Sequence, residues 1–255
     1  MKTTVILAIA IFTSASIGAL SGGYVGVKAG IIFTENLTCC GTPRSANLFF
    51  TLKELTGLIK FNSQLGQDRW IVQRVFPDVR AGYFVDVGSG DGVFMSNTKV
   101  LEELGWNGVC IDPFPENMTK RTCTTFNEVV DSEAGRKLNF RVAGFFGGIE
   151  EHIGTHKDKT AGSRTVELTS TTLADILARA KAPQFIHYVS IDVEGAELAA
   201  LLGFPFSEYK VGAFTIEHAH EEPKRSQIKT LLESKGYRRA RAVKHDDFYV
   251  LNENS

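Results

Sequence analysis

A short run of small and acidic residues follows the apolar, β-branched stretch at residues 83–87. It consists of Gly88, Ser89, Gly90, Asp91 and Gly92. Glycine has no side chain, so such a turn lets the backbone approach a bound ligand closely. Asp112 ends the next apolar stretch, near the distance of about twenty residues at which an acid accepts hydrogen bonds from a ribose. The combination predicts a nucleoside site, although a glycine-rich turn alone is often only a tight turn.

The glycine spacing and the charge of this loop indicate which nucleoside binds. A dinucleotide-binding G-x-G-x-x-G motif that begins at Gly88 would need glycine where the chain has Val93, and no G-x-x-x-x-G-K-[ST] loop for ATP or GTP occurs. The acids Asp86 and Asp91 would repel a phosphate, but they suit the cationic sulfonium and the amino group of S-adenosylmethionine. We therefore expect S-adenosylmethionine as the cofactor.

A second group of acids lies further along the chain. Asp192 and Glu194 follow an apolar stretch and are two positions apart, so at a strand end their side chains would lean to the same face. Glu194 and Glu197 have an alternative role as caps of the following helix, which we favour for Glu197 and leave open for Glu194. After the next apolar stretch, Glu217 or His218 is a second candidate base, because histidine titrates near neutral pH.

The E-H-x-H order of residues 217–220 also fits part of a metal site. Such sites need a further ligand brought in from elsewhere, and a solvated strand end explains the same residues. We therefore expect no metal.

Alternating strands and helices surround both groups. Strands are expected at residues 83–87, 108–112, 185–193, 211–217, 239–243 and 248–252, with a third strand of the sheet at 124–130, and helices at 96–104, 173–181, 197–202 and 226–236. This alternation favours an α/β fold with a doubly wound, mostly parallel sheet. The glycine-rich segment 144–162 is either a substrate lid or a plain surface insertion.

Six segments together resemble the FkbM-type S-adenosylmethionine-dependent methyltransferases. They are SQLGQD (63–68), FVDVGSGDG (84–92), SNT (96–98), GWNG (105–108), SIDVEGAE (190–197) and HDDFYV (245–250). The resemblance covers nearly everything after residue 62, and the D-x-E-G-x-E segment is its most specific part. It implies a class I methyltransferase fold, Rossmann-like, with seven strands and the ligand at the carboxyl ends of the strands.

The resemblance also implies roles for particular residues. Asp192 would lie near the methionine part or the transferred methyl group, and Glu194 would organise the site or act as a base. The expected catalytic residues are Asp192, Glu194 and His218. The expected cofactor-binding residues are Asp86, Gly88, Ser89, Gly90, Gly92, Asn97, Asp112, Pro113 and Asp192.

Two functions follow as alternatives. The first is O-methylation of a hydroxyl on a small metabolite, sugar or lipid. The second is a methyltransferase-like, membrane-anchored subunit with a structural or assembly role in a larger membrane complex. The acids Asp86, Asp112 and Asp192 are all present, which favours the enzyme.

The N-terminus is apolar and carries no charged side chain between Lys2 and Lys28. Residues 5–27 reach the length of about twenty residues that spans a bilayer, but a cleavable secretory signal has a similar pattern. We expect a single-pass membrane anchor at 1–34, with a secreted or lumenal domain after signal cleavage as the alternative. Residues 35–62 would be a linker with a short helix at 48–59, and 63–255 the methyltransferase domain. Other membrane proteins are possible partners of the anchor.

Composition excludes some other classes of protein. The 28 Lys and Arg against 29 Asp and Glu give a net charge of -1, so we expect no nucleic-acid partner. Cys39, Cys40, Cys110 and Cys123 are too few and too irregularly spaced for a disulfide framework or a zinc ribbon. The N-x-[ST] sequences at Asn36 and Asn117 are treated as chance matches.

Overall fold

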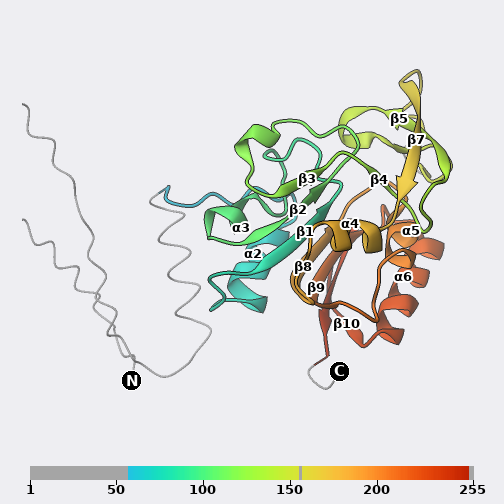
Figure 1. Cartoon of the computed structure of the whole chain (residues 1–255). Coiled ribbons are helices and arrows are strands. Elements are labelled where there is room, and N and C mark those ends of the chain that lie inside the picture. Colours follow the sequence, from blue (N-terminus) through green and yellow to red (C-terminus); the bar gives the residue numbers. More distant parts are fainter. Residues whose placement is uncertain (1–56, 155–156, 253–255) are drawn as a thin grey trace, which may run out of the picture. The chain divides into compact units, whose positions relative to one another are not determined.

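The computed structural model describes residues 57–154 and 157–252 (Figure 1). The expected anchor at 5–27 and most of the expected linker helix at 48–59 lie outside these residues. Among the described residues, no helix is both long enough and apolar enough to cross a membrane.

A seven-stranded sheet forms the centre of the domain, in the order β10-β11-β9-β8-β1-β2-β3. Its strands are β1 (Tyr83–Val87), β2 (Asn107–Ile111), β3 (Thr124–Phe126), β8 (Phe185–Ile191), β9 (Lys210–Glu217), β10 (Tyr237–Val243) and β11 (Asp246–Leu251). The five strands from β3 to β9 are parallel, and β11 runs antiparallel to both β9 and β10. The prediction of a mostly parallel sheet of seven strands is confirmed.

Helices cover both faces of this sheet because its strands are apolar on both sides (Figure 1). Val85 and Val87 point to one face, where they join a core with α4 (Leu173–Arg179), α5 (Glu197–Leu202) and α6 (Glu222–Ser234). Phe84 points to the other face and joins α2 (Gln67–Trp70), the π-helix η1 (Ile71–Val75) and α3 (Lys99–Glu103). This alternation of neighbouring side chains is the two-residue period of a strand.

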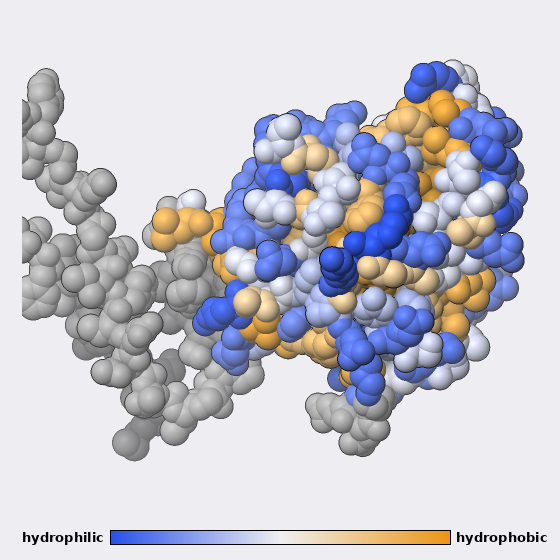
Figure 2. All heavy atoms as spheres, viewed as in Figure 1, coloured by the Kyte–Doolittle hydropathy of each residue, from blue (hydrophilic) through white to orange (hydrophobic). Residues whose placement is uncertain are grey.

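The surface drawn in Figure 2 is mostly polar, with small groups of apolar residues between the polar ones. One such group lies near β5 and β7.

A second sheet of four strands was not predicted. It has the order β4-β7-β5-β6 and consists of β4 (Val129–Val130), β5 (Lys137–Val142), β6 (Gly148–Ile149) and β7 (Arg164–Thr171). The strand expected at 124–130 is divided between the two sheets, because β3 pairs with β2 whereas β4 pairs with β7. Two 3-10 helices, η2 (Met118–Lys120) and η3 (Gly144–Phe146), lie in the connecting segments.

Several predicted boundaries differ from the structure by a few residues. The helix expected at 96–104 begins only at Lys99, because the Ser96 hydroxyl accepts hydrogen bonds from the backbone N–H groups of Thr98 and Lys99 and so starts a turn. The last helix begins at Glu222 rather than 226, with Pro223 in its first turn, where proline is tolerated. β8 ends at Ile191, which leaves the acids that follow it in the connecting turn.

Candidate functional site

A cavity of about 390 Å³ lies at the carboxyl ends of β1, β2, β8 and β9. In a doubly wound sheet this edge is the usual place for a ligand, and the volume is within the usual range for small-molecule sites. Most of the predicted site residues line it, namely Asp86, Gly88, Ser89, Gly90, Asn97, Asp112, Pro113, Asp192 and Glu194. The structure does not bring Gly92 or His218 into the lining.

The turn after β1 is in direct contact with the turn after β8. Gly88 has φ +85°, and a Cβ atom on it would lie 1.7 Å from the carbonyl oxygen of Asp192. The Gly88 N–H donates to the carbonyl of Ile111 at 2.8 Å, which ties the same turn to the end of β2. Only glycine fits this position, because it needs both the left-handed backbone and the empty space.

Asp112 lies at the end of β2 and faces the cavity. Its two carboxylate oxygens accept hydrogen bonds from the N–H groups of Gly90 (2.9 Å) and Phe114 (2.8 Å). Burial raises the pKa of Asp112, and these hydrogen bonds partly oppose the rise. Each carboxylate oxygen can accept a further bond, so Asp112 can still receive the hydroxyls of a ribose.

Asp86, just before the glycine loop, is held by contacts with Thr98 and Arg121. Its carboxylate accepts a hydrogen bond from the Thr98 hydroxyl at 2.5 Å and lies 3.8 Å from the Arg121 guanidinium. Burial raises the pKa of Asp86, and the charge of Arg121 lowers it.

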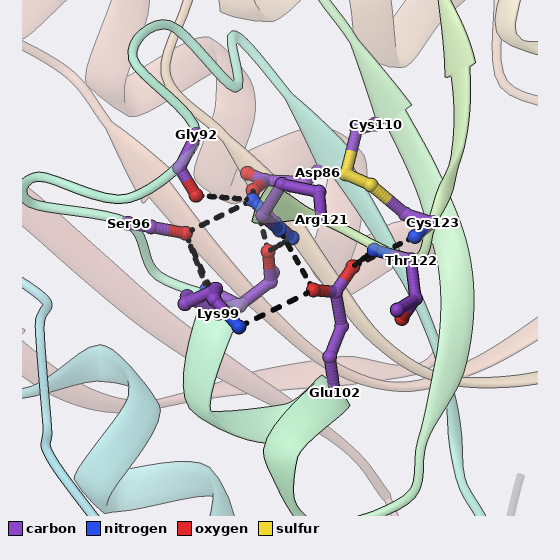
Figure 3. Close-up of a disulfide and its surroundings, with 10 residues drawn as sticks. Asp86, Gly92, Ser96, Lys99, Glu102, Cys110, Arg121, Thr122 and Cys123 are labelled. Atoms are coloured by element: carbon purple, nitrogen blue, oxygen red, sulfur yellow. Dashed lines mark hydrogen bonds and ion pairs between the residues drawn. A yellow bond between two sulfur atoms is a disulfide. The ribbon is translucent and has the colours of Figure 1, made fainter. Parts of the chain in front are cut away.

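Arg121 is a buried residue that the sequence analysis did not single out (Figure 3). Its guanidinium donates to the carbonyl of Gly92 at 2.8 Å, to Thr98 at 2.7 Å and to Glu102 at 2.9 Å. It therefore joins the glycine loop to α3. Gly92 does not line the cavity, and it contributes to the site only through the hydrogen bond that its carbonyl accepts from Arg121. No motif marks Arg121, because its partners come from distant parts of the sequence.

A disulfide joins Cys110 in β2 to Cys123, just before β3 (Figure 3). From the spacing of the four cysteines no disulfide framework was expected, and these two cysteines had no predicted role. Both become neighbours only when β2 and β3 pair, so the bond could not be predicted from spacing. The bond therefore connects the chain just before Asp112 to the chain just after Arg121.

Two buried polar atoms in the cavity wall have no hydrogen-bond partner among the described residues. They are the hydroxyl oxygen of Ser89 and the amide oxygen of Asn97. The Asn97 side chain is held by its amide nitrogen, which donates to the Ser190 hydroxyl at 2.9 Å. An unsatisfied buried polar group costs about 1–3 kcal/mol, so such atoms are typical of a place where a ligand binds.

The acids after β8 form the other end of the cavity. Asp192 lines the cavity and is exposed to water. Desolvation raises its pKa, a hydrogen bond with Glu217 opposes this rise, and the charge of Glu197 adds to it. Burial and the charge of Asp192 raise the pKa of Glu194 to about 8. Glu194 has φ 52°, an unusual backbone conformation for a residue with a side chain.

Glu197 has a structural role, but it binds the turn before α5 and does not cap the helix as expected. Its carboxylate accepts a hydrogen bond from the N–H of Gly195 at 2.8 Å and pairs with Lys224 at 2.8 Å. It therefore fixes the turn that carries Asp192 and Glu194.

Glu217, at the end of β9, lies beside the β8 acids. Burial and the charge of Asp192 raise its pKa. Asp246, at the start of β11, is also close, and burial raises its pKa to about 7. Gln67 donates to Asp246 at 2.7 Å, and the His245 ring is 3.1 Å from Gln64. The SQLGQD and HDDFYV segments therefore meet at this end of the cavity.

His218 points away from these acids. Its side chain is buried, and its Nε2 atom lies 3.9 Å from Asp247. Burial lowers its pKa to about 4, so the ring is neutral at physiological pH. Its neighbours Glu217 and His220 line the cavity instead. From the sequence, Glu217 was a candidate base only as an alternative to His218.

Aromatic side chains surround the mouth of the cavity. Phe94 and Phe145 contact each other with 5.7 Å between ring centres, and they are 59% and 51% exposed. Phe146 and Lys159 lie on the same side, from the segment 144–162. This segment is therefore part of the cavity wall, and its closing motion as a lid stays a prediction.

The family model for the methyltransferase FkbM domain matches residues 86–239, from β1 to β10. The chain belongs to the FkbM methyltransferase family. The FkbM match includes the glycine loop, Asp112 and the acids after β8 and β9, whereas SQLGQD and HDDFYV lie outside it. A search of curated proteins found no match to the chain.

Proposed function

We propose that this FkbM domain binds S-adenosylmethionine and transfers its methyl group to a hydroxyl of a small acceptor. The observation that supports this most is that a single cavity joins the glycine loop and Asp112 at one end to the carboxyl groups of Asp192, Glu194 and Glu217 at the other. The two ends suit two different tasks, cofactor binding and acceptor chemistry.

The residues at the first end fit the cofactor. Asp112 would accept hydrogen bonds from the ribose hydroxyls, and the unpartnered oxygens of Ser89 and Asn97 would receive further polar groups. Asp192 would face the positively charged methionine part. When bound, S-adenosylmethionine supplies an electrophilic methyl group on its sulfonium. The protein has to align the acceptor oxygen with that methyl group.

The residues at the second end fit the acceptor. A hydroxyl must lose its proton during transfer, and a base works best when its pKa is near the working pH. Glu194, with a pKa raised to about 8, meets this condition. The exposed rings of Phe94 and Phe145 at the mouth favour an acceptor with an apolar part, such as a lipid or an aromatic alcohol, over a bare sugar.

Cofactor binding is tested by calorimetry with the full chain in detergent and S-adenosylmethionine or its demethylated product. We expect one site per chain. Asp112→Asn should weaken binding about 10- to 100-fold, because a hydrogen bond to a charged group contributes about 1.5–3 kcal/mol. Glu116→Gln is the matched control, since it removes a nearby negative charge that does not line the cavity. Absence of heat in the folded wild type would reject the enzyme and leave the assembly-subunit alternative.

Methyl transfer is tested with labelled cofactor and two acceptor sets, amphiphilic alcohols and simple sugars. We expect label in the first set and none with Asp192→Ala. Label in sugars alone would contradict the role assigned to the aromatic mouth.

For localisation we propose that the domain lies on the oxidising side of a membrane, as a lumenal or extracellular domain behind the apolar segment 5–27. The disulfide between Cys110 and Cys123 supports this, because disulfides persist in oxidising compartments and are rare in the cytosol. Either a retained anchor or a cleaved signal would deliver the domain there.

A further inference from the structure

The acids at the second end of the cavity lie close enough together to share one counter-ion. One oxygen from each of Asp192, Glu194 and Glu217 lies within 4.8 Å of the other two. A second group shares Glu217 and adds Asp246 and the His245 ring, again within 4.8 Å. Like charges at such distances repel strongly, so the cluster needs protons or a cation.

The charges of Lys159 and Lys224 lower the pKa of Glu194 only in part, and both lysines have other partners. Lys224 pairs with Glu197 at 2.8 Å and with Glu221 at 3.2 Å, and Lys159 lies over the Phe146 ring. Among the described residues, no Lys or Arg forms an ion pair with Asp192 or Glu217.

Glu217 provides an independent sign of a missing partner. The residue is only 9% exposed and lines the cavity, and apart from a proton that its carboxyl group can share with Asp192, its Oε2 atom has no hydrogen-bond donor among the described residues. Burying an unpaired carboxylate oxygen is costly, and such an atom in a native structure often marks an ion or a ligand.

We infer that Asp192, Glu194 and Glu217 form a binding site for a divalent cation of the Mg²⁺ or Mn²⁺ type. Hard cations bind carboxylate oxygens at about 2.0–2.6 Å, so oxygens on opposite sides of one ion are about 4–5 Å apart, as in this cluster. Asp246 and His245 lie next to Glu217 and would orient it or add a ligand. The histidine ring is 3.9 Å from Glu217 and 3.7 Å from Asp246.

The backbone supports such a site. Glu194 has φ 52°, and Gly195 follows with φ +122°, where a Cβ atom would lie 2.0 Å from the carbonyl oxygen of His152. The turn is therefore held in one unusual conformation, and that conformation directs the Glu194 carboxylate toward Asp192 and Glu217.

The contribution of this cation to catalysis rests on the proposed function. It would contact the acceptor oxygen, hold it in place and lower the pKa of its hydroxyl, so that the proton could pass to water. With the cation bound, Glu194 would act as its ligand, and the base role proposed above would apply only without the cation. Cation binding itself needs neither cofactor nor acceptor, so the two proposals can fail separately.

The test titrates the full chain with Mn²⁺ and follows the paramagnetic resonance signal of the free ion, without cofactor. We expect one Mn²⁺ per chain and at least tenfold weaker binding in both Glu217→Gln and Glu194→Gln. Glu128→Gln is the matched control, because Glu128 also lines the cavity but pairs with Arg179. It should bind Mn²⁺ as the wild type does.

Three outcomes would overturn the inference. They are no binding by the folded wild type up to millimolar Mn²⁺, unchanged binding in both variants, and release of the ion when S-adenosylmethionine binds. The last result would mean that the cofactor is the cation for these acids. Thermal unfolding of each variant shows that weaker binding is not loss of the fold. Cofactor calorimetry on the same samples tests the proposed function separately.

Discussion

Gly88 is the residue where the two ends of the site meet. Its φ of +85° places the turn after β1 close enough to contact the carbonyl of Asp192. The position of Asp192 therefore depends on the absence of a side chain on a residue from another strand. This dependence explains why a glycine loop and a D-x-E-G segment, far apart in sequence, belong to one site.

Gly88→Ala tests this contact, and Gly135→Ala is its matched control. Both glycines have nearly the same φ, +85° and +83°, but nothing lies within 4 Å of a Cβ on Gly135. Both variants should lose about 1–2 kcal/mol for the left-handed backbone. Gly88→Ala should lose a further 1–3 kcal/mol, roughly, because its methyl group displaces the Asp192 carbonyl.

The readouts are urea unfolding and cofactor calorimetry. Cofactor binding should weaken in Gly88→Ala and stay unchanged in Gly135→Ala. Equal losses of stability and unchanged binding in both would show that the β1 and β8 turns do not depend on each other.

At the scale of elements, hydrogen bonds to one buried carboxylate connect α6 to the β10–β11 hairpin. Asp247 in β11 accepts two hydrogen bonds from Arg225 of α6, at 2.9 and 2.8 Å, and one from Arg239 of β10 at 2.8 Å. These three elements flank the strand end that carries Glu217. Arg225 therefore stabilises the packing of α6 on β11, next to the second end of the cavity.

Asp247→Asn should lower the free energy of unfolding by about 2–4 kcal/mol at pH 7, because it removes the buried charge partner that Arg225 and Arg239 share. Burial raises the pKa of Asp247, but hydrogen bonds from Arg225 and Arg239 lower it more, so the pKa lies below its usual value. The stabilisation is thus complete above the unfolded pKa of about 4 and is lost as the pH falls through the lower folded pKa.

Urea unfolding from pH 7 to pH 2 checks both statements. The difference between wild type and Asp247→Asn should shrink below about pH 4. Glu222→Gln, which removes only an exposed partner of Arg225, should cost less than about 1 kcal/mol. A pH-independent difference for Asp247→Asn would mean that its effect comes from packing and not from charge.

The same elements show what the sequence predicts and what it does not. β1 and α5 have the predicted bounds, because each is a short, largely apolar run that ends at a glycine, Gly88 and Gly203. The second sheet was missed because β4 and β6 have only two residues each and β7 is mostly polar. β5 does alternate between polar and apolar residues, so its sequence could have predicted a strand. Ser89, Asn97 and Asp112 were predicted for the cavity, since they lie within motifs.

Arg121 and Asp246 belong to contacts that form only after folding. Arg121 joins the glycine loop to α3, and Asp246 meets Gln67 across a long stretch of the chain. No local pattern identifies such contacts, so they could not be predicted from one sequence.

At the scale of the whole molecule, the disulfide lies beside the cofactor end of the cavity and bears on the cellular compartment of the domain. Cys110 and Cys123 lie 13 positions apart and enclose Asp112 and Arg121, so the bond restrains residues on both sides of the cofactor end. The core there is already well packed, since Cys110 is buried with Phe84 and Trp106. The bond should therefore affect stability through the unfolded chain more than through the folded shape.

Reduction should lower the free energy of unfolding by roughly 3 kcal/mol, the value for a closed loop of about 15 residues. For a domain of this size that corresponds to a fall in Tm of about 6–12 °C. The double variant Cys110→Ser, Cys123→Ser should unfold near the temperature of the reduced wild type and should not respond to reductant. In cells, alkylation before lysis should leave both cysteines unlabelled until reductant is added. An unchanged Tm on reduction, or immediate labelling of both thiols, would contradict an oxidising compartment for this domain.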